Sequence, residues 1–273
     1  MSLVNAELFK VRTTSLWWIM AIVLVPLYAA SVLLNWANSN ISVPDDAAVS
    51  DTQTAQLEAS LEPINVATNL YTSGQYMGVL IVLLLSAIIV TSEFFHLTAT
   101  TTFLTTPRRE SVILAKFGAA IVIGLIVWLF TTVLNLIVVP PIMSALDLSS
   151  QLGEPAVWRA IGLNALAFVL WAILGVGAGV LIRSQIAATL VLAITYVVGT
   201  SAIGLVFFLL SEYVAEWINN LQVLVPTSAS QLMISGTDLP GTPPRWVGAV
   251  VLIGYAAVTG ILGTWLTKRR DIS

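Results

Sequence analysis

Residues 71–92 read YTSGQYMGVLIVLLLSAIIVTS, and residues 93–116, which follow directly, read EFFHLTATTTFLTTPRRESVILAK. The first stretch carries no charged side chain and is long enough to cross a bilayer as a helix, which takes about 20 residues. The second contains the adjacent charges Arg108, Arg109 and Glu110. Each charge at the bilayer centre costs roughly 2.5–3.5 kcal/mol. We therefore predict that the first stretch is a span and the second a connection.

The composition of the whole chain agrees with this interpretation. Of its 273 residues 58% are hydrophobic and 9% are charged, with a mean hydropathy of +0.94. A soluble domain has about 25% charged residues, and a soluble core of this size could not bury so much apolar surface. The sequence therefore predicts an integral membrane protein. Cysteine is absent, which excludes disulfides and cysteine-based metal or redox sites.

Apolar runs of spanning length recur along the chain. They are too long and too continuously apolar for the strands of a membrane barrel, and a helix satisfies its own backbone hydrogen bonds in lipid. We expect an all-α polytopic membrane protein, with residues 1–273 forming a single domain. Its six transmembrane helices are expected at about residues 16–36, 71–92, 117–140, 160–182, 184–211 and 246–267.

The basic residues predict the direction of the spans. An even number of spans puts both termini on one side, and only Arg159 and Arg245 lie on the other. Because loops rich in Lys and Arg stay in the cytoplasm, both termini are predicted to be cytoplasmic. The basic residues on the side of the termini are Lys10, Arg12, Arg108, Arg109, Lys116, Arg183, Lys268, Arg269 and Arg270.

Shorter helices are expected outside the spans. Residues 1–15 have the pattern of an amphipathic helix on the inner membrane face, the alternative being a frayed terminus. On the outer side, residues 54–70 are expected to hold a helix that ends near Pro63. Residues 212–225 are expected to form another, broken by Pro226 before the sixth span. The motif GVGAG at residues 175–179 favours close packing of helices.

The sequence lacks the motifs of common membrane enzymes. It has no G-x-x-x-x-G-K-[ST] phosphate-binding loop and no G-x-S-x-G nucleophile motif. The predicted spans carry no acidic, basic or histidine side chain. We therefore expect no enzymatic activity, no metal site and no cofactor in this chain. Uncharged spans also count against an ion-coupled carrier, which usually has ionisable groups within the bilayer.

Neutral polar and aromatic side chains within the spans have two interpretations. They can form packing contacts and hydrogen bonds between helices, or they can line a substrate path. Such an uncharged lining would favour a hydrophobic or amphipathic substrate. The candidates for a path are Trp128, Thr132, Asn135, Asn164, Trp171, Thr195 and Tyr196.

The connection of residues 93–116 has the composition of a docking surface. Phe103 and Leu104 form an apolar pair, and Arg108 and Arg109 follow closely. An exposed apolar pair beside two cations suits contact with a soluble protein. The alternative is that the two arginines only contact anionic lipid head groups.

This connection resembles the loop after the second span in permeases of type-2 ATP-binding-cassette (ABC) exporters, actinobacterial ones in particular. These permeases commonly read E-[FY]-R-H-G-T…T-F-L-x-T-P-R-R…K at this place. The pattern A-E-L-x-K-x-R-T-T-x-x-W-W of residues 6–18 is also similar to their start. Two positions differ, because Phe95 stands where Arg is common and Leu97 where Gly is common.

The resemblance implies that the chain works with other subunits. Two permeases, identical or homologous, would pair around a path for export, and each would bind a separate ATPase that holds ATP and Mg²⁺. Glu93 would anchor the end of the second span. The implied location is the bacterial plasma membrane, with lipid and no nucleic acid as further partners. The implied ATPase-docking residues are Glu93, His96, Thr98, Phe103, Leu104, Pro107, Arg108 and Arg109.

A membrane protein that transports nothing is the alternative from another class. A scaffold or sensor subunit could bind a partner through the same connection, and its spans would also need no charge. An ion-coupled carrier ranks behind both, because the spans are uncharged.

Overall fold

The computed structural model describes residues 3–41, 51–98 and 109–269, and every regular element in these ranges is a helix. Six helices there are long and apolar enough to cross a membrane, as predicted. The spanning elements are α2 (Leu16–Asn38), α5 (Gln75–Phe95), α7 (Arg109–Ala145), α8 (Pro155–Ile182), the continuous α9 (Gln185–Ile194), η1 (Thr195–Gly199) and α10 (Thr200–Tyr213), and α12 (Arg245–Arg269). The shorter elements are α1 (Leu3–Thr13), α3 (Asp51–Leu61), α4 (Pro63–Tyr71), η2 (Glu216–Leu224) and α11 (Pro226–Ile234).

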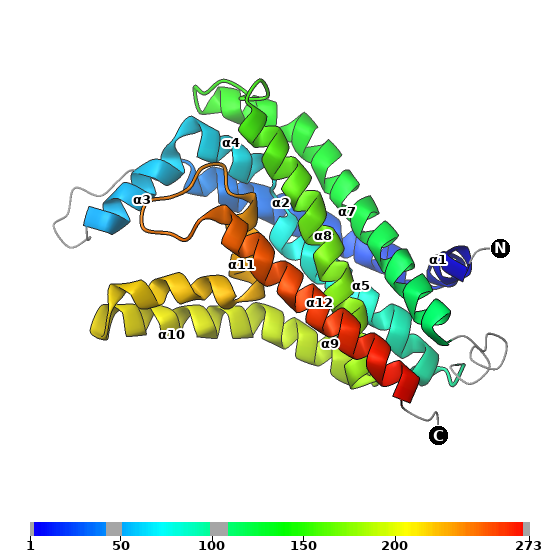
Figure 1. Ribbon diagram of the computed structural model, residues 1–273. Coiled ribbons are helices and arrows are strands. Elements are labelled where there is room, and N and C mark those ends of the chain that lie inside the picture. The colour runs from blue at the N-terminus through cyan, green and yellow to red at the C-terminus, as the bar shows by residue number, and fades with distance from the viewer. Residues whose placement is uncertain (1–2, 42–50, 99–108, 270–273) are drawn as a thin grey trace.

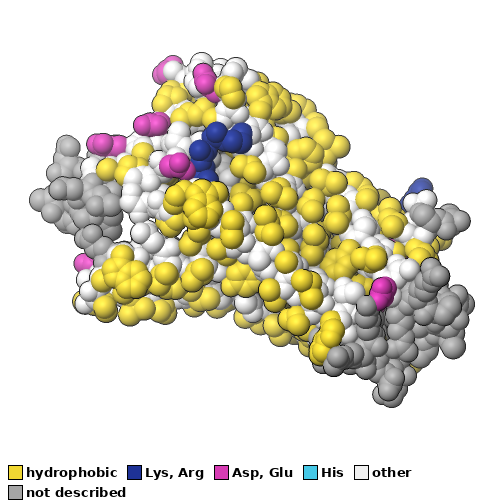
Figure 2. Space-filling view, viewed as in Figure 1, with side chains coloured by type: hydrophobic (Ala, Val, Ile, Leu, Met, Phe, Trp, Pro, Cys, Tyr) yellow, Lys and Arg dark blue, Asp and Glu magenta, His cyan; other side chains and the backbone are white. Residues whose placement is uncertain are grey.

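The spanning helices lie as an inclined bundle. Figure 1 shows α7, α8 and α12 across the front, with α2 and α5 behind them. Helix α1, the end of α12, the end of α5 and the start of α7 lie at the same end of this bundle. Helix α1 is seen almost end-on there, so it crosses the direction of the spans. In Figure 2 hydrophobic side chains cover the middle of this face, and charged side chains lie mainly toward its ends.

Helices α5 and α8 form the centre of the bundle. We compare one apolar stretch of 18 residues from each segment. In the segment of α4 and α5 78% of this stretch is buried, and in α8 61%, against 6% in the segment from α9 to α10. A Cβ added at Gly175 would lie 2.5 Å from the carbonyl oxygen of Leu83 on α5. One added at Gly177 would lie 2.6 Å from that of Thr259 on α12. The packing role expected for the GVGAG motif is therefore confirmed.

Span five is attached to the bundle at few points. Helix α10 has no buried residue, and Ala188 is the buried residue of α9. Between them the π-helix η1 holds Tyr196, which is 4% exposed and donates a hydrogen bond of 2.6 Å to the Tyr76 carbonyl. Much of this apolar segment thus faces outward, as suits contact with lipid or another subunit.

Two prolines begin helices that were not predicted from the sequence. Helix α3 ends near Pro63 as expected, but Pro63 then begins α4. Pro226 likewise begins α11 where a break was expected, and the segment before it is the 3₁₀-helix η2. Proline suits a first helical turn, because its fixed φ is helical and its missing N–H would have no partner there.

The polar connection is shorter than predicted. Helix α5 continues to Phe95, and α7 begins at Arg109, well before the expected start of the third span at residue 117. Glu93 and Lys116, which were assigned to the connection, are therefore helical, and each lies just outside the uncharged run predicted as a span. Several predicted docking positions lie outside the described residues: Phe103, Leu104, Pro107, Arg108 and the side chain of Arg109.

Candidate functional site

Four charged side chains from three helices meet at the end of the bundle where α5 ends and α7 begins. Glu7 and Lys10 come from α1, Glu93 from the last turn of α5, and Lys116 from α7. Lys116 Nζ lies 2.8 Å from Glu7 Oε2 and 3.0 Å from Glu93 Oε1. Lys10 Nζ lies 2.7 Å from Glu7 Oε1 and 2.6 Å from Glu93 Oε1. Acids and bases alternate in a closed ring, which we call the charge cluster.

Three members of the charge cluster are shielded from solvent. The exposed fraction of the side chain is 2% for Lys116, 6% for Glu7 and 7% for Glu93, against 48% for Lys10. Lys116 Nζ also donates to the Ile89 carbonyl at 3.2 Å. Removing one partner of a buried ion pair leaves the other charge uncompensated, at a cost of about 3–5 kcal/mol. The ring therefore opposes separation of α1, α5 and α7.

Lys10 is the member of the charge cluster that faces solvent. Burial lowers the pKa of Lys10, but its hydrogen bonds and charge interactions with Glu7 and Glu93 outweigh this, so the pKa is raised. Its stabilising contribution is complete below the ordinary value of 10.5 and is lost only as pH rises through the raised value. Lys10 is therefore a cation throughout the neutral range.

A cavity of about 450 Å³ adjoins the charge cluster. Its lining brings Glu93, His96 and Thr98, three of the predicted docking residues, together with Glu7 and Lys10. The backbone N–H of Thr98 donates to the Glu93 carbonyl at 2.9 Å, which closes the end of α5. The His96 side chain is exposed at this end. Residues 93–98, with which the connection begins, therefore lie directly beside the charge cluster.

The turn between α8 and α9 also contacts the end of α5. Arg183 ends α8 in the left-handed region, with φ at 54°, and its guanidinium carbon lies 5.4 Å from the centre of the Phe94 ring. Ser184 Oγ then accepts a hydrogen bond from the Ala187 N–H and caps α9. A cation over an aromatic ring contributes about 0.5–1 kcal/mol at an exposed site. Helix α8 is thereby joined to the end of α5, where the connection begins.

The candidates for a substrate path fall into separate places. Asn135 is 1% exposed, accepts a hydrogen bond from the Tyr28 hydroxyl at 2.8 Å, and donates to the carbonyls of Tyr71 and Ser73. It joins α2, α7 and the turn between α4 and α5. Trp128 Nε1 donates to the Ile161 carbonyl on α8 at 3.1 Å.

Two other candidates are brought together. The rings of Trp171 and Tyr196 lie 5.1 Å apart between centroids, and Trp171 Nε1 donates to Ser230 Oγ at 3.4 Å. Thr195 begins the π-helix η1, next to Tyr196. Thr132 Oγ1 and Asn164 Oδ1 are buried and have no hydrogen-bond partner within the described ranges.

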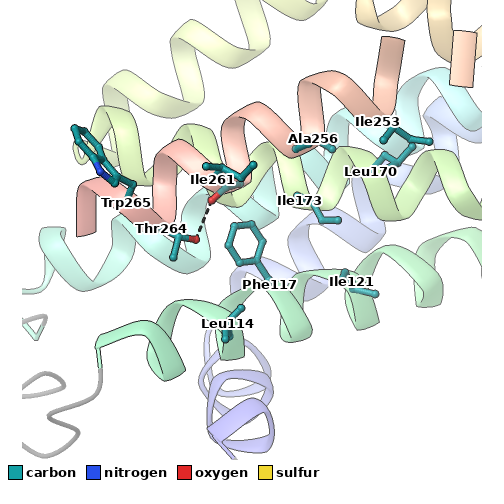
Figure 3. Close-up of a pocket in the computed structure, with 12 residues that line it drawn as sticks. Leu114, Phe117, Ile121, Leu170, Ile173, Ile253, Ala256, Ile261, Thr264 and Trp265 are labelled. Atoms are coloured by element: carbon teal, nitrogen blue, oxygen red, sulfur yellow. Dashed lines mark hydrogen bonds between the residues drawn. The ribbon is translucent and has the colours of Figure 1, made fainter. Parts of the chain in front are cut away.

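An apolar cavity of about 660 Å³ lies between α7, α8 and α12. Figure 3 shows Phe117 of α7 beside Ile173 of α8 and Ile261 of α12 in its lining. The hydroxyl of Thr264 donates to the Gly260 carbonyl of its own helix at 2.8 Å, so it is already bonded. This cavity suits an acyl chain or another apolar group.

No protein-family model matches this chain, and no curated protein matches it significantly. Within residues 3–41, 51–98 and 109–269 there is no group of three or more His, Asp or Glu placed to hold a metal ion. The acids and bases of the charge cluster neutralise one another, so the arrangement suits mechanical linkage of helices rather than proton transfer.

Sequence reasoning missed three members of the charge cluster: Glu7, Lys10 and Lys116. A signal for them existed. Glu7 and Lys10 stand three residues apart on one face of the amphipathic first helix. Glu93 and Lys116 carry opposite charges where two apolar runs end and begin. That the two pairs meet depends on where α1 packs, which the local pattern does not specify.

Proposed function

We propose that this chain is the transmembrane subunit of an ABC exporter, which takes up mechanical work from a separate ATPase bound at residues 93–116. One observation carries the proposal: the charge cluster joins both helices that flank this connection, and α1, through buried ion pairs. Separating these helices would leave charges unpaired in a buried place. A displacement of the connection would therefore move α5 and α7 together.

Further features support the same proposal. The chain has no phosphate-binding loop of its own, so ATP and Mg²⁺ would be held by the partner and this chain would not be an enzyme. The connection resembles the ATPase-docking loop of type-2 ABC permeases in sequence. Glu93, which is buried in the charge cluster, would anchor the end of α5. Docking would use His96, Thr98, Phe103, Leu104, Pro107, Arg108 and Arg109.

The proposal also includes a second permease and a class of cargo. A second permease, identical or homologous, would complete the path, and the outward-facing α10 offers surface for it. The uncharged interior and the apolar cavity of Figure 3 favour a hydrophobic or amphipathic cargo. The termini would lie in the cytoplasm, and the resemblance to exporters implies that this cargo leaves the cell across a bacterial plasma membrane.

Affinity purification from native membranes tests the proposal. Tagged protein is isolated in mild detergent, before and after chemical cross-linking, and co-purifying proteins are identified by mass spectrometry. We expect an ATPase with a phosphate-binding loop, at about one copy per permease, and the same experiment reveals any second permease. Recovery of no ATPase in either preparation would contradict the proposal and favour a scaffold or sensor subunit.

A further inference from the structure

A second apolar cleft, of about 570 Å³, lies where α1 meets the spanning helices. Helices α1, α2, α5 and α7 all contribute to its lining. Its base is the buried cluster of Leu24, Ile81 and Leu85. Along α7 the lining extends from Val122 to Phe130, about 12 Å at 1.5 Å per residue. The cleft is therefore long and apolar.

Arg12 supplies a charge in this lining. Its side chain is exposed, and among the described residues no carboxylate forms an ion pair with it. The neighbouring base Lys10 differs, because Glu7 and Glu93 neutralise it. Arg12 thus adds an uncompensated positive charge to a cleft that is otherwise apolar.

Trp17 fixes the geometry of this corner. Its Nε1 donates to the Arg12 carbonyl at 3.1 Å, which holds the end of α1 against the start of α2. Trp17 is itself part of the lining. Tryptophan is enriched at the level of the lipid head groups. The cleft therefore has Arg12 and Trp17 at one end and an apolar slot beyond them.

We propose that this cleft binds an anionic phospholipid from the leaflet on the side of the termini. One acyl chain fills the slot above Leu24, Ile81 and Leu85, and the phosphate accepts hydrogen bonds from the Arg12 guanidinium. Guanidinium groups bind phosphate oxygens in a bidentate manner. The uncompensated charge selects an anionic over a zwitterionic head group, since each basic residue near a membrane surface attracts anionic lipid. The cavity of Figure 3 has no Lys or Arg in its described lining, so it offers no such selection of the head group.

Lipid in this cleft would also stabilise the position of α1. Leu8, Val11 and Arg12 of α1 line the cleft, while Glu7 and Lys10 of the same helix belong to the charge cluster. A bound lipid and the charge cluster therefore hold α1 from two adjacent faces. This consequence does not depend on the identity of the protein's partners.

Native mass spectrometry tests the lipid site directly. Purified protein is delipidated and mixed with equal amounts of phosphatidylglycerol and phosphatidylcholine, and the bound lipid is counted. We expect a preference for phosphatidylglycerol of about fivefold, which corresponds to about 1 kcal/mol per basic residue. Arg12→Gln should abolish this preference, Arg12→Lys should keep part of it, and Arg159→Gln at the other end of the bundle should keep all of it.

A second variant separates the acyl slot from the head-group contact. Ala21 lines the cleft and is exposed, so Ala21→Trp fills the slot without disturbing a buried residue. We expect it to lower the number of bound phosphatidylglycerol molecules per protein by one. An unchanged preference in Arg12→Gln, an equal loss in Arg159→Gln, or full lipid retention in Ala21→Trp would each overturn the proposal.

Discussion

Lys116 Nζ of α7 lies 3.0 Å from Glu93 Oε1 of α5, so the two ends of the polar connection are joined by an ion pair that is almost fully buried. Glu7 and Lys10 extend this pair into a ring that includes α1. Any protein that binds the connection therefore acts on three helices at once.

Lys116→Met should destabilise the protein more than any change of Lys10. Loss of the 2% exposed ammonium leaves Glu7 and Glu93 with Lys10 as their remaining partner in the charge cluster, and we expect a loss of about 3–5 kcal/mol. Lys10→Met should cost no more than about 1 kcal/mol, since its side chain is half exposed. Denaturant unfolding in detergent, followed by tryptophan fluorescence, measures both. Equal losses in the two variants would show that Lys116 is not the buried centre of the ring.

Gly175→Ala should disturb the contact between α8 and α5. The added methyl group would lie 2.5 Å from the Leu83 carbonyl oxygen, so the backbones must separate, at a cost of about 1–3 kcal/mol. Gly162→Ala on the same helix is the matched control, because an added Cβ there meets no atom within 4 Å. Thermal unfolding of the two variants in the same detergent compares them. A stable Gly175→Ala protein would contradict the close approach of these helices.

The sequence was most informative where one property repeats along the chain. Six uncharged runs of spanning length are enough to predict six helices, because lipid leaves the backbone no other partner. Helix ends were less predictable. Pro63 and Pro226 were each interpreted as an end, yet each also begins a helix, and proline is compatible with both places.

The candidate site was only partly predictable for a different reason. Glu93 was identified through the resemblance of its loop, whereas Lys116 was placed at the start of a span with no partner. Their pairing with Glu7 requires α1 to pack across the ends of α5 and α7. That packing arises from contacts between residues more than eighty positions apart, such as Lys10 with Glu93. A local periodicity does not contain this information.

Asn135→Ala should weaken the junction between α2, α7 and the start of α5. The change leaves the Tyr28 hydroxyl and the carbonyls of Tyr71 and Ser73 without their present partner in a buried place. We expect a loss of about 1–3 kcal/mol, measured by denaturant unfolding. Asn69→Ala, at an exposed position two residues before Tyr71, should change stability by less than about 0.5 kcal/mol. If Asn135 lines a substrate path and does not serve packing, its removal would leave stability unchanged and alter transport alone.

Reversing the charge of the arginine pair should uncouple transport from the ATPase without blocking membrane insertion. Arg108→Glu with Arg109→Glu replaces two cations at the proposed docking surface, so an ATPase surface of complementary charge would be repelled. We expect normal amounts in the membrane fraction but loss of ATP-dependent export. Arg159→Glu, at the opposite end of the bundle, serves as the control and should leave export intact. Full export by the double variant would count against docking at this pair.

Docking of an ATPase at residues 93–116 is the central claim, and site-specific photo-cross-linking in living cells tests it most directly. A photoreactive amino acid replaces Phe103 in the connection or, as the control, the exposed Tyr213 at the end of α10. After irradiation the cross-linked partners are identified by mass spectrometry. The account predicts an ATPase with a phosphate-binding loop cross-linked from position 103 and none from position 213. Cross-links from position 103 to lipid alone, or to a protein without such a loop, would contradict it.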